Sequence, residues 1–373
     1  MDEIRVALFG TTGFAANYVE AFKNPKREKV RLVAVVDPYA SGFDLAPLYA
    51  DAERMYAEAS PDVAVIATPI QLHKEQAIQA FEHGCHVVLE KPLAGCADDA
   101  RAILAARERA GKLLNVDYQL CYDPVIRAVK RDADSGVFGA PRELKVIVLW
   151  PRGFAYYGRS TRWAGRRLDE QGRAIYDSVL NNATAHYLMN MLFMTGAGAE
   201  NIQCRTYRAN DIETCDTAVL KAVSAGAQIF MAASHAVKPS EKQEPLLEYR
   251  YENATLRYCR ASLQGGNMIA QFNDGRIRDY GTAGQFQLEN LWNMIDAIRL
   301  GSPLFCTGEI ALLQTLTVEG MRAVQPDAQP FPEYMISSDS DMRWVEGLAA
   351  ALWHAFETAT LPELGKDELY FPG

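Results

Sequence analysis

A lysine at the end of a short apolar strand is the first residue in this chain that could do chemistry. The stretch from His86 to Leu89 has the composition of a buried strand, and Glu90, Lys91 and Pro92 end it. Proline has no N–H group with which to extend a ladder of strands. In an open α/β sheet, a lysine at the carboxyl end of a strand points into the crevice where such sheets bind ligands. Lys91 is therefore a candidate ligand-binding residue, and a solvated strand end is the alternative.

A second set of polar residues follows one face of a predicted helix. The segment from Asp177 to Phe193 has a helical pattern, in which Asn182 and His186 stand four residues apart and hence side by side. Asn190 continues this polar face. An imidazole with polar neighbours can act as a general base or acid. A histidine that only packs in the core is the alternative. Since no carboxylate or cysteine stands near it at the spacing of metal ligands, we expect no metal site.

Arginines and aromatic rings alternate in residues 152–167. Rigid rings and fork-shaped donors suit a polar, ring-shaped or carboxylate ligand. A solvated basic loop and an oligomer interface, where Tyr, Trp and Arg are enriched, are the alternatives. The candidate substrate-binding residues of this segment are Arg152, Tyr157, Arg159, Trp163 and Arg166.

A glycine turn follows the first predicted strand, residues 4–9, and a helical pattern begins directly behind it. Strand, glycine turn and helix form the context that a dinucleotide-binding loop requires. The turn lets backbone N–H groups and the start of the helix face a pyrophosphate. Thr12 stands where the G-x-G-x-x-G pattern has its second glycine. The candidate cofactor contacts in this turn are Gly10, Thr12, Gly13, Phe14 and Ala15.

An acidic residue ends the second predicted strand. Asp37 follows the apolar residues 31–36 directly. A carboxylate at this place suits the ribose 2′-hydroxyl of NAD and would repel the 2′-phosphate of NADP. A turn or helix cap is the alternative role for Asp37. The expected cofactor is therefore NAD.

The elements around these residues divide the chain in two. Up to residue 116, short strands alternate with helices, which predicts a doubly wound parallel (Rossmann) sheet of the α/β class. Beyond residue 122, alternating segments joined by turns predict an α+β domain with a large, mostly antiparallel open sheet. The predicted domains are 1–122, for dinucleotide binding, and 123–373, for substrate binding and oligomerisation with a C-terminal helical extension. Strands are expected at 143–150, 217–223, 228–235, 247–251, 255–260 and 268–272, and helices at 288–300, 309–324 and 342–358.

Composition limits the classes of function. The chain has 373 residues, which is long for a single core. Its net charge of -9 argues against a nucleic-acid or anionic-membrane partner. No apolar run reaches the roughly 20 residues of a membrane span, and the first residues lack a signal-peptide pattern. The seven scattered cysteines form no CxxC pair, as expected of reduced thiols in a cytoplasmic protein.

Together these motifs resemble the Gfo/Idh/MocA family of NAD(P)-dependent oxidoreductases, over roughly residues 4–324. The most specific part is Glu90-Lys91-Pro92, placed after Ala67-Thr68-Pro69 and His73 and before the helix that carries His186. The resemblance implies a cis peptide before Pro92. It also implies that Lys91 holds the reacting hydroxyl or carbonyl oxygen and that His186 takes and returns the proton. It implies further cofactor contacts at Thr68, Pro69, His73, Glu90 and Lys91, and a substrate contact at Tyr118.

The function implied by this resemblance is hydride transfer between NAD and a secondary alcohol or ketone of a sugar, cyclitol or sugar acid. Asn182, which would orient His186, stands where the family usually has an aspartate. A homodimer or homotetramer through the sheet of the second domain is expected. Two alternatives stay open: a redox-assisted lyase or glycosidase that retains its NAD, and a non-catalytic nucleotide-sensing regulator with the same fold.

Overall fold

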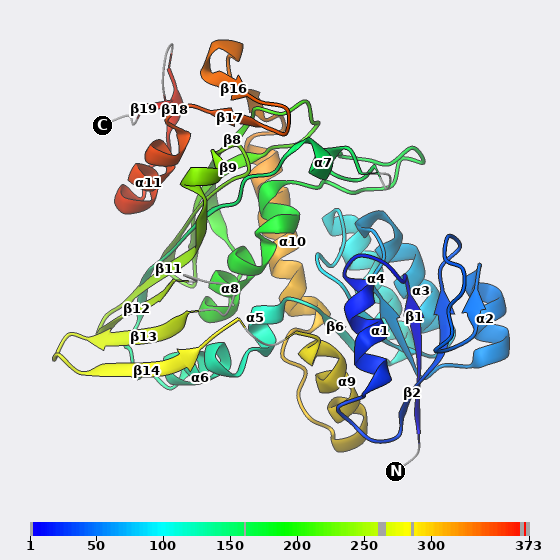
Figure 1. Ribbon diagram of the computed structural model, residues 1–373. Coiled ribbons are helices and arrows are strands. Elements are labelled where there is room, and N and C mark those ends of the chain that lie inside the picture. Colours follow the sequence, from blue (N-terminus) through cyan, green and yellow to red (C-terminus); the bar gives the residue numbers. More distant parts are fainter. Residues whose placement is uncertain (1–2, 160–161, 260–265, 285–286, 366–368, 371–373) are drawn as a thin grey trace. The chain divides into compact units, whose positions relative to one another are not determined.

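The computed structural model describes residues 3–159, 162–259, 266–284, 287–365 and 369–370 (Figure 1). The chain divides into two compact units. The first contains residues 1–122 and 286–312, and the second contains residues 123–285 and 313–373. The predicted second domain, residues 123–373, differs from the observed second unit because residues 286–312 belong to the first unit. These residues return to the first unit because their apolar side chains complete its core.

The first unit is built on a six-stranded sheet. Its strands lie in the order β3-β2-β1-β4-β5-β6, and every neighbouring pair is parallel. The predicted doubly wound parallel sheet is therefore confirmed. The strands consist mostly of buried apolar residues because both faces of the sheet are covered. They are β1 (Ile4–Phe9), β2 (Val30–Val36), β3 (Leu48–Tyr49), β4 (Val63–Ile66), β5 (His86–Leu89) and β6 (Leu114–Val116).

Helices cover both faces of this sheet. On one face, Tyr18 of the first helix and Trp292 of α9 pack against Leu8 in a common core. On the other face, the rings of Phe9 and Tyr56 lie 6.2 Å apart. The helices of the unit are α1 (Ala15–Lys23), α2 (Ala52–Ala59), η1 (Ile70–Leu72), α3 (His73–Glu82), α4 (Ala97–Ala110), α5 (Gln119–Tyr122) and α9 (Glu289–Leu300).

The second unit is built on a nine-stranded sheet in the order β14-β13-β12-β11-β7-β10-β9-β8-β15. Its pairs are antiparallel, except for β7 with β10 and β8 with β15, which are parallel. The predicted large, mostly antiparallel sheet is confirmed. The strands are β7 (Pro141–Leu149), β8 (Glu200–Arg208), β9 (Thr217–Ser224), β10 (Ala227–Ser234), β11 (Gln243–Tyr251), β12 (Ala254–Cys259), β13 (Asn267–Phe272), β14 (Ile277–Thr282) and β15 (Gln329–Pro330).

Helices and two small hairpins complete the second unit, and one helix, α10, crosses the boundary between the units. The hairpins are β16 (Ile336–Ser338) with β17 (Arg343–Val345), and β18 (Glu363–Leu364) with β19 (Leu369–Tyr370). The helices are α6 (Pro124–Asp134), α7 (Phe154–Tyr157), η2 (Val179–Ala183), α8 (Ala185–Thr195), η3 (Pro239–Glu241), α10 (Gly308–Val324), η4 (Glu333–Met335) and α11 (Leu348–Thr358).

The two faces of the nine-stranded sheet carry different helices. One face of the sheet, which we call the inner face, carries Tyr249, whose hydroxyl donates a 2.6 Å hydrogen bond to Oδ1 of Asn190 in α8. On the outer face, α11 packs on Ile147 and Phe230, and Nζ of Lys145 lies 4.8 Å from the centre of the Phe356 ring. Figure 1 shows α8 and α11 on opposite sides of the sheet. The outer face is therefore covered by the chain's own α11 over its middle strands.

Two local differences from the predicted elements have physical reasons. The predicted helix over 177–193 begins as the π-helix η2, because the Thr184 hydroxyl donates to the backbone oxygen of Val179 at 2.6 Å and interrupts the regular ladder. The predicted helix over 342–358 starts only at Leu348, because Gly347 has a φ of 73° and separates β17 from α11. Strands β8 and β14 were not predicted.

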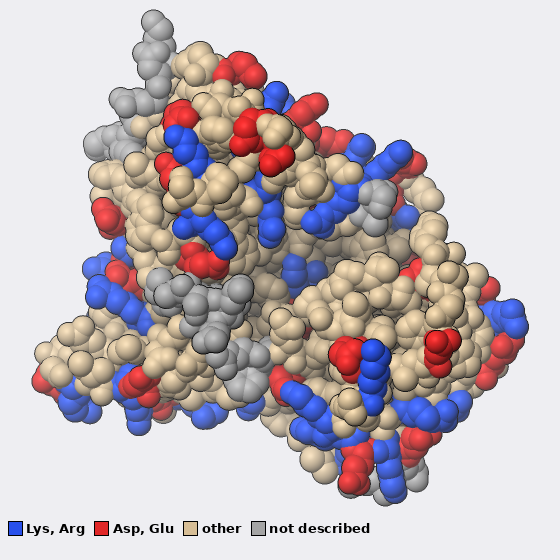
Figure 2. All heavy atoms as spheres, viewed as in Figure 1, with Lys and Arg blue, Asp and Glu red and all other residues tan. Residues whose placement is uncertain are grey.

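The surface of the described residues carries no dominant charge of one sign on the face seen in Figure 2, where acidic and basic side chains are interspersed. Within the described ranges, no helix has the length and apolar character needed to cross a membrane. The six cysteines whose side chains are described are free thiols.

Candidate functional site

Four of the predicted site segments meet at one edge of the first sheet. Gly10 follows β1, Asp37 follows β2, Thr68 lies just beyond β4, and Lys91 lies just beyond β5. Because the strands are parallel, their carboxyl ends share this edge. The order of the strands reverses between β1 and β4, which is the switch point where open α/β sheets bind ligands.

The glycine turn after β1 has the geometry of a dinucleotide-binding loop. Gly10 has a φ of 94°, and a Cβ placed on it would lie 3.0 Å from the backbone oxygen of Ala67. Gly13 also has a positive φ, 61°. Helix α1 begins at Ala15, and no side chain caps its first backbone N–H groups. The ring of Phe14 packs edge-on against Tyr18 at 6.0 Å. These residues fit a bound pyrophosphate at the start of α1.

Asp37 is held by two hydrogen bonds at the end of β2. The Thr11 hydroxyl donates to Oδ2 of Asp37 at 2.6 Å, and the backbone N–H of Tyr39 donates to Oδ1 at 3.0 Å. The side chain is thus oriented, half-buried, at the carboxyl edge. Thr12, which the sequence analysis singled out, is exposed, whereas the neighbouring Thr11 makes the contact. Only the fold reveals this role, because either threonine fits the sequence pattern.

His73 joins two of the loops at this edge. Its Nδ1 lies 2.9 Å from the backbone oxygen of Pro92, and its Nε2 lies 3.0 Å from that of Thr68. The ring is wholly buried, and this burial lowers the pKa of His73 to about 4. The structure thus makes His73 a support for the Thr68-Pro69 and Lys91-Pro92 loops. The peptide between Lys91 and Pro92 is cis, which confirms the expectation from the family resemblance.

Two residues that were predicted to contact the cofactor or the substrate, Glu90 and Tyr118, are buried inside the first unit. Glu90 is 9% exposed and accepts a 3.0 Å hydrogen bond from the Tyr18 hydroxyl. Tyr118 is wholly buried, and burial raises the pKa of Tyr118 well above its ordinary value. Lys91, between the buried Glu90 and the buried Pro92, is partly exposed. Lys91 is therefore the residue of this group best placed to reach a ligand.

The second unit gathers an arginine–aromatic cluster around Tyr156. The guanidinium carbon of Arg159 lies 4.1 Å from the centre of the Tyr156 ring and 4.8 Å from that of Trp163. Arg152 lies over the same tyrosine ring at 5.0 Å. Tyr157 packs edge-on against Tyr156 at 5.1 Å. Rings and guanidinium groups at these distances attract each other through cation–π contacts and hold a rigid polar surface.

Arg166 stands apart from this cluster. Its side chain is exposed, and its nearest described acidic partner is Glu213, at 3.7 Å. Four of the five residues predicted in this segment are thus brought together, and Tyr156 joins them as their common neighbour. His235 also belongs to the cluster: its ring centre lies 6.0 Å from that of Tyr156, and its Nδ1 lies 2.7 Å from the backbone oxygen of Trp150. The sequence feature that could have identified His235 is its position at the end of the predicted strand, residues 228–235.

A buried carboxylate supports Asn182. Asp177, which is 3% exposed, accepts a 2.9 Å hydrogen bond from Nδ2 of Asn182 and a 2.7 Å bond from the backbone N–H of Gly165. Asn182 lies in η2 and His186 in the first turn of α8, and both side chains are partly exposed. The arrangement provides an amide that donates to a buried carboxyl group.

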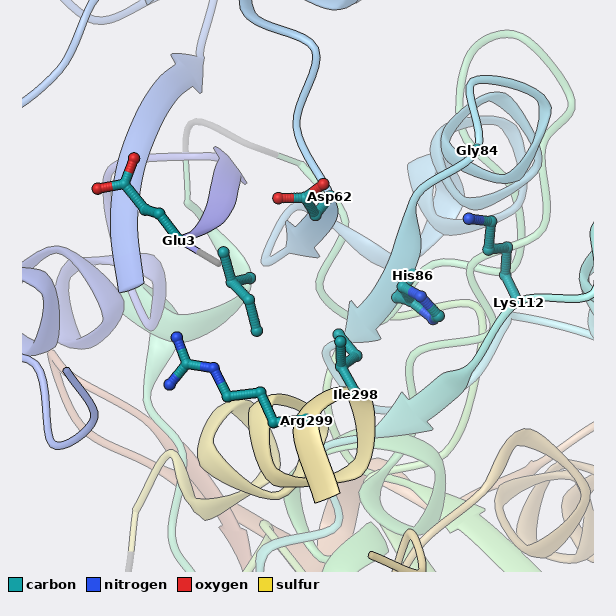
Figure 3. Close-up of a pocket in the computed structure, with 8 residues that line it drawn as sticks. Glu3, Asp62, Gly84, His86, Lys112, Ile298 and Arg299 are labelled. Atoms are coloured by element: carbon teal, nitrogen blue, oxygen red, sulfur yellow. The ribbon is translucent and has the colours of Figure 1, made fainter. Parts of the chain in front are cut away.

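A cavity of the first unit lies at the opposite edge of its sheet. It has a volume of about 340 Å³ and is lined by residues before or at the start of the strands, among them Glu3, Asp62, His86, Lys112 and Arg299 (Figure 3). None of the predicted site residues lines it. Among the described residues, no group of three or more His, Cys, Asp or Glu side chains could hold a metal ion.

Comparison with known proteins identifies the fold and the relationship of the first unit. Residues 4–118 match the model of an oxidoreductase family, GFO_IDH_MocA, with an NAD-binding Rossmann fold. The chain is 27% identical to D-apiose dehydrogenase of Rhizobium rhizogenes over 215 residues, which are 56% of this chain and 59% of that protein. It is 34% identical to inositol 2-dehydrogenase of Rubrobacter xylanophilus over 154 residues, 38% of this chain and 42% of the relative. The chain thus spans less than two thirds of either relative.

A solved structure extends the likeness of fold over both units. An oxidoreductase from Agrobacterium radiobacter, solved in complex with NAD+, L-tartaric acid and magnesium, superimposes with a TM-score of 0.72 at 23% identity. The superposition covers 87% of this chain and 96% of the other. Residues 4–118, within the first unit, are thus similar to the GFO_IDH_MocA family of oxidoreductases with an NAD-binding Rossmann fold, and the solved structure shows the same fold over both units.

Proposed function

We propose that the protein is an NAD-dependent dehydrogenase acting on a secondary alcohol, or the matching ketone, of a sugar, cyclitol or sugar acid. The observation that carries this proposal is Lys91, which is partly exposed at the carboxyl edge of a parallel sheet that also bears the glycine turn. The relatives named for apiose and inositol support the same class of substrate.

The carboxyl edge of the first sheet would hold NAD. The tight turn at Gly10 and the N–H groups at the start of α1 suit the pyrophosphate. Asp37 would accept hydrogen bonds from the ribose hydroxyls, and Thr11 would keep the carboxylate in place. When bound, NAD supplies the acceptor or donor of the hydride.

Two side chains would handle the oxygen and the proton of the substrate. Lys91 would donate a hydrogen bond to the reacting oxygen, and this bond strengthens as negative charge develops there. His186 would accept the hydroxyl proton during oxidation and return it during reduction. Asn182 would orient His186, and Asp177 would orient Asn182 through their 2.9 Å hydrogen bond.

The arginine–aromatic cluster would recognise the substrate. Arg152 and Arg159 can donate paired hydrogen bonds to hydroxyl or carboxylate oxygens, while Tyr157 and Trp163 offer rigid faces to a ring. Arg166, which points to Glu213, is left out of this proposed set.

The test begins with binding. Thermal melting is measured with NAD, NADP and their reduced forms, and then with apiose, inositols and sugar acids beside the better cofactor. NAD should raise the melting temperature, and at least one polyol should yield NADH. Lys91→Ala and His186→Ala should each lower kcat roughly a hundredfold while the stabilisation by NAD persists. Leu300→Ala, an exposed side chain of the first unit, serves as the control.

Three other results would favour a different function or contradict the NAD site. Stabilisation by NAD without turnover of any substrate in the panel would favour the nucleotide-sensing regulator. Substrate conversion that forms no net NADH would favour the redox-assisted lyase or glycosidase. An unchanged melting temperature with every cofactor would contradict the proposal of an NAD site.

We also propose that the protein forms a homo-oligomer through the uncovered strands of the second sheet. Ile269 of β13 and Ile277 of β14 lie on the outer face, where they are 38% and 70% exposed. An exposed apolar pair beside charged residues is typical of an interface between subunits. Ile277→Glu should therefore lower the mass measured by sedimentation, whereas Leu300→Glu should not. A monomeric unmodified protein would contradict this proposal.

A further inference from the structure

Two acidic side chains stand next to each other where β5 and β6 end. Leu89 and Val116 are paired in parallel register, so Glu90 and Asp117 follow at equivalent positions on neighbouring strands. The backbone N–H of Asp117 continues the ladder with a 2.8 Å hydrogen bond to the oxygen of Leu89. Glu90 is 9% exposed and Asp117 is 1% exposed. The fold thus buries two carboxyl groups side by side.

The groups around the Glu90–Asp117 pair provide few hydrogen-bond donors to its carboxyl oxygens. Glu90 accepts from the Tyr18 hydroxyl at 3.0 Å, and Nδ2 of Asn290 donates to that hydroxyl oxygen at 2.7 Å. No N–H or O–H group of the described residues meets the geometry of a hydrogen bond to either Asp117 oxygen, although the Gln119 amide lies close by. A proton on one of the two carboxyl groups would supply the missing donor.

Electrostatics favours such a proton. Burial, and secondarily the charge of Asp117, raises the pKa of Glu90 well above its ordinary value. Burial raises the pKa of Asp117 to about 7. Two carboxylates this close and this buried cannot both ionise at low cost, because each disfavours the charge on the other. The two groups therefore titrate as one system.

The other titratable groups that face the pair come from three elements. Lys91, directly after Glu90, places a positive charge near both carboxyl groups. Tyr18 of α1, with Cys121 and Tyr122 of α5, completes the set, and burial raises the pKa of each of these three well above its ordinary value. The three stay neutral, and α9 contributes only the amide of Asn290. Lys91 is hence the cation of this cluster among the described residues.

We propose that Glu90 and Asp117 share one proton at neutral pH, so that the pair carries a single negative charge that balances and positions the ammonium group of Lys91. Glu90 and Asp117 are then positioning residues for Lys91 rather than catalytic residues. Their effect on turnover rests on the proposed dehydrogenase function, whereas the shared proton does not. As pH rises, ionisation of the second carboxyl group would add a negative charge near the substrate oxygen that Lys91 is proposed to contact. This charge would disfavour the alkoxide that develops on that oxygen during oxidation.

The first experiment tests the shared proton without any substrate. The infrared C=O stretch of a protonated carboxyl group should be present in the unmodified protein near neutral pH and lost in Asp117→Asn. It should persist in Asp44→Asn, which removes an exposed carboxylate of the same unit. A spectrum in which Asp117→Asn leaves the carboxyl band unchanged would overturn the proposal.

The second experiment uses stability. The folded pair binds more protons than the unfolded chain between roughly pH 4 and roughly pH 7, so its contribution is lost as pH rises through this window. The folding equilibrium constant of Asp117→Asn, divided by that of the unmodified protein, should rise by up to about tenfold per pH unit there. Asp44→Asn should show a constant ratio. A constant ratio for Asp117→Asn as well would contradict the shared proton.

The third experiment separates charge from packing. Asp117→Asn and Glu90→Gln each leave one carboxylate and hence one negative charge, whereas the double variant leaves none beside Lys91. With NAD and the best substrate, kcat of the double variant should fall at least about tenfold below that of either single variant, with KM changed much less. Equal losses in all three variants would show a merely structural role. An inactive unmodified protein would instead contradict the proposed dehydrogenase function. The two substrate-free experiments would still test whether Glu90 and Asp117 share a proton.

Discussion

Asn182 donates a hydrogen bond to the buried Asp177 carboxylate and stands four residues before His186. The carboxyl group of Asp177 is thus the acceptor for the amide of Asn182. Residues four apart on a helix lie side by side, so a carboxylate at position 182 would favour the protonated imidazole of His186.

The pH dependence of oxidation should therefore respond to the residue at position 182. Asn182→Asp should leave NAD binding intact and move the acid limb of the oxidation-rate profile to higher pH, because the base must be deprotonated to take the proton. The double variant Asn182→Asp with Asp177→Asn is the matched test, since it exchanges the two side chains and keeps both the charge and the hydrogen bond. An acid limb at the same pH in the exchanged variant would remove His186 from the proton relay.

A second prediction concerns Asp37 and cofactor choice. The carboxylate, fixed by Thr11, should make NAD bind at least roughly tenfold more tightly than NADP, since a charge-assisted contact contributes about 1.5–3 kcal/mol. Asp37→Ser combined with Tyr39→Arg should narrow the gap, because Tyr39 is 96% exposed and an arginine there can reach a phosphate. Isothermal titration with both cofactors measures this. Equal affinities in the unmodified protein would contradict the role of Asp37.

The sequence predicted the position of the candidate residues that follow strands, because a strand end places a side chain at a known edge of the sheet. Lys91 and Asp37 were found in this way. Asp117 was passed over, although it also follows a strand, because its significance depends on Glu90 across the ladder. Asp177 and Thr11 depend likewise on partners that only the fold brings near.

At the scale of elements, α9 shows how a distant segment completes a core. Leu291, Trp292, Met294 and Ile295 are almost wholly buried, and they pack with the apolar residues of β1 and β4. Without α9, one face of the sheet would expose this apolar surface to water. Fully burying one such side chain contributes about 1.5–3 kcal/mol, so the helix supplies a large part of the stability of the unit.

This contribution can be tested with fragments. A fragment of residues 1–122 should lack a cooperative thermal transition, whereas the same fragment with residues 286–312 joined through a flexible linker should regain it. Trp292→Ala in the joined fragment should cost about 3–5 kcal/mol, as loss of a buried large aromatic does. Calorimetry gives the comparison, with Leu300→Ala as an exposed control in the same helix. A cooperative transition in residues 1–122 alone would contradict the role assigned to α9.

The sequence predicted most of the elements but not their partners. The alternation of apolar strands and helices up to residue 116 follows from local pattern, and the structure agrees with it. The return of α9 to the first unit leaves no local signal, because an amphipathic helix reveals its apolar face and not the surface that receives it. The parallel pair of β7 and β10 is likewise a property of the topology.

For the whole molecule, buried histidines set a response to acid. Burial lowers the pKa of His73 in the first unit, and of His235 in the second, to about 4 in each case. A histidine with a depressed folded-state pKa contributes stability above its unfolded value, near 6.5, and that contribution is lost as pH falls toward about 4. Each unit therefore carries a site that weakens it on acidification.

The two units should differ in the pH at which they weaken. In the first unit, the Glu90–Asp117 pair opposes His73, since it adds stability as pH falls. Calorimetry between roughly pH 7 and roughly pH 5 should show that His235→Gln reduces the acid sensitivity of the second unit and leaves the first unchanged. An identical response in the variant and the unmodified protein would contradict the argument for His235.

The return of α9 also orders events while the chain is being synthesised. All six strands of the first sheet have been made by residue 116, but Trp292 and its neighbours, which cover one face, are added much later. At about 5–20 residues per second, a nascent chain spends roughly 10–35 seconds with the part of that apolar face that α9 covers still exposed. During this interval most of the second unit emerges. The first unit is thus synthesised first but completes its core only after α9 has been made. Its uncovered apolar face is the surface that a chaperone would bind on the growing chain.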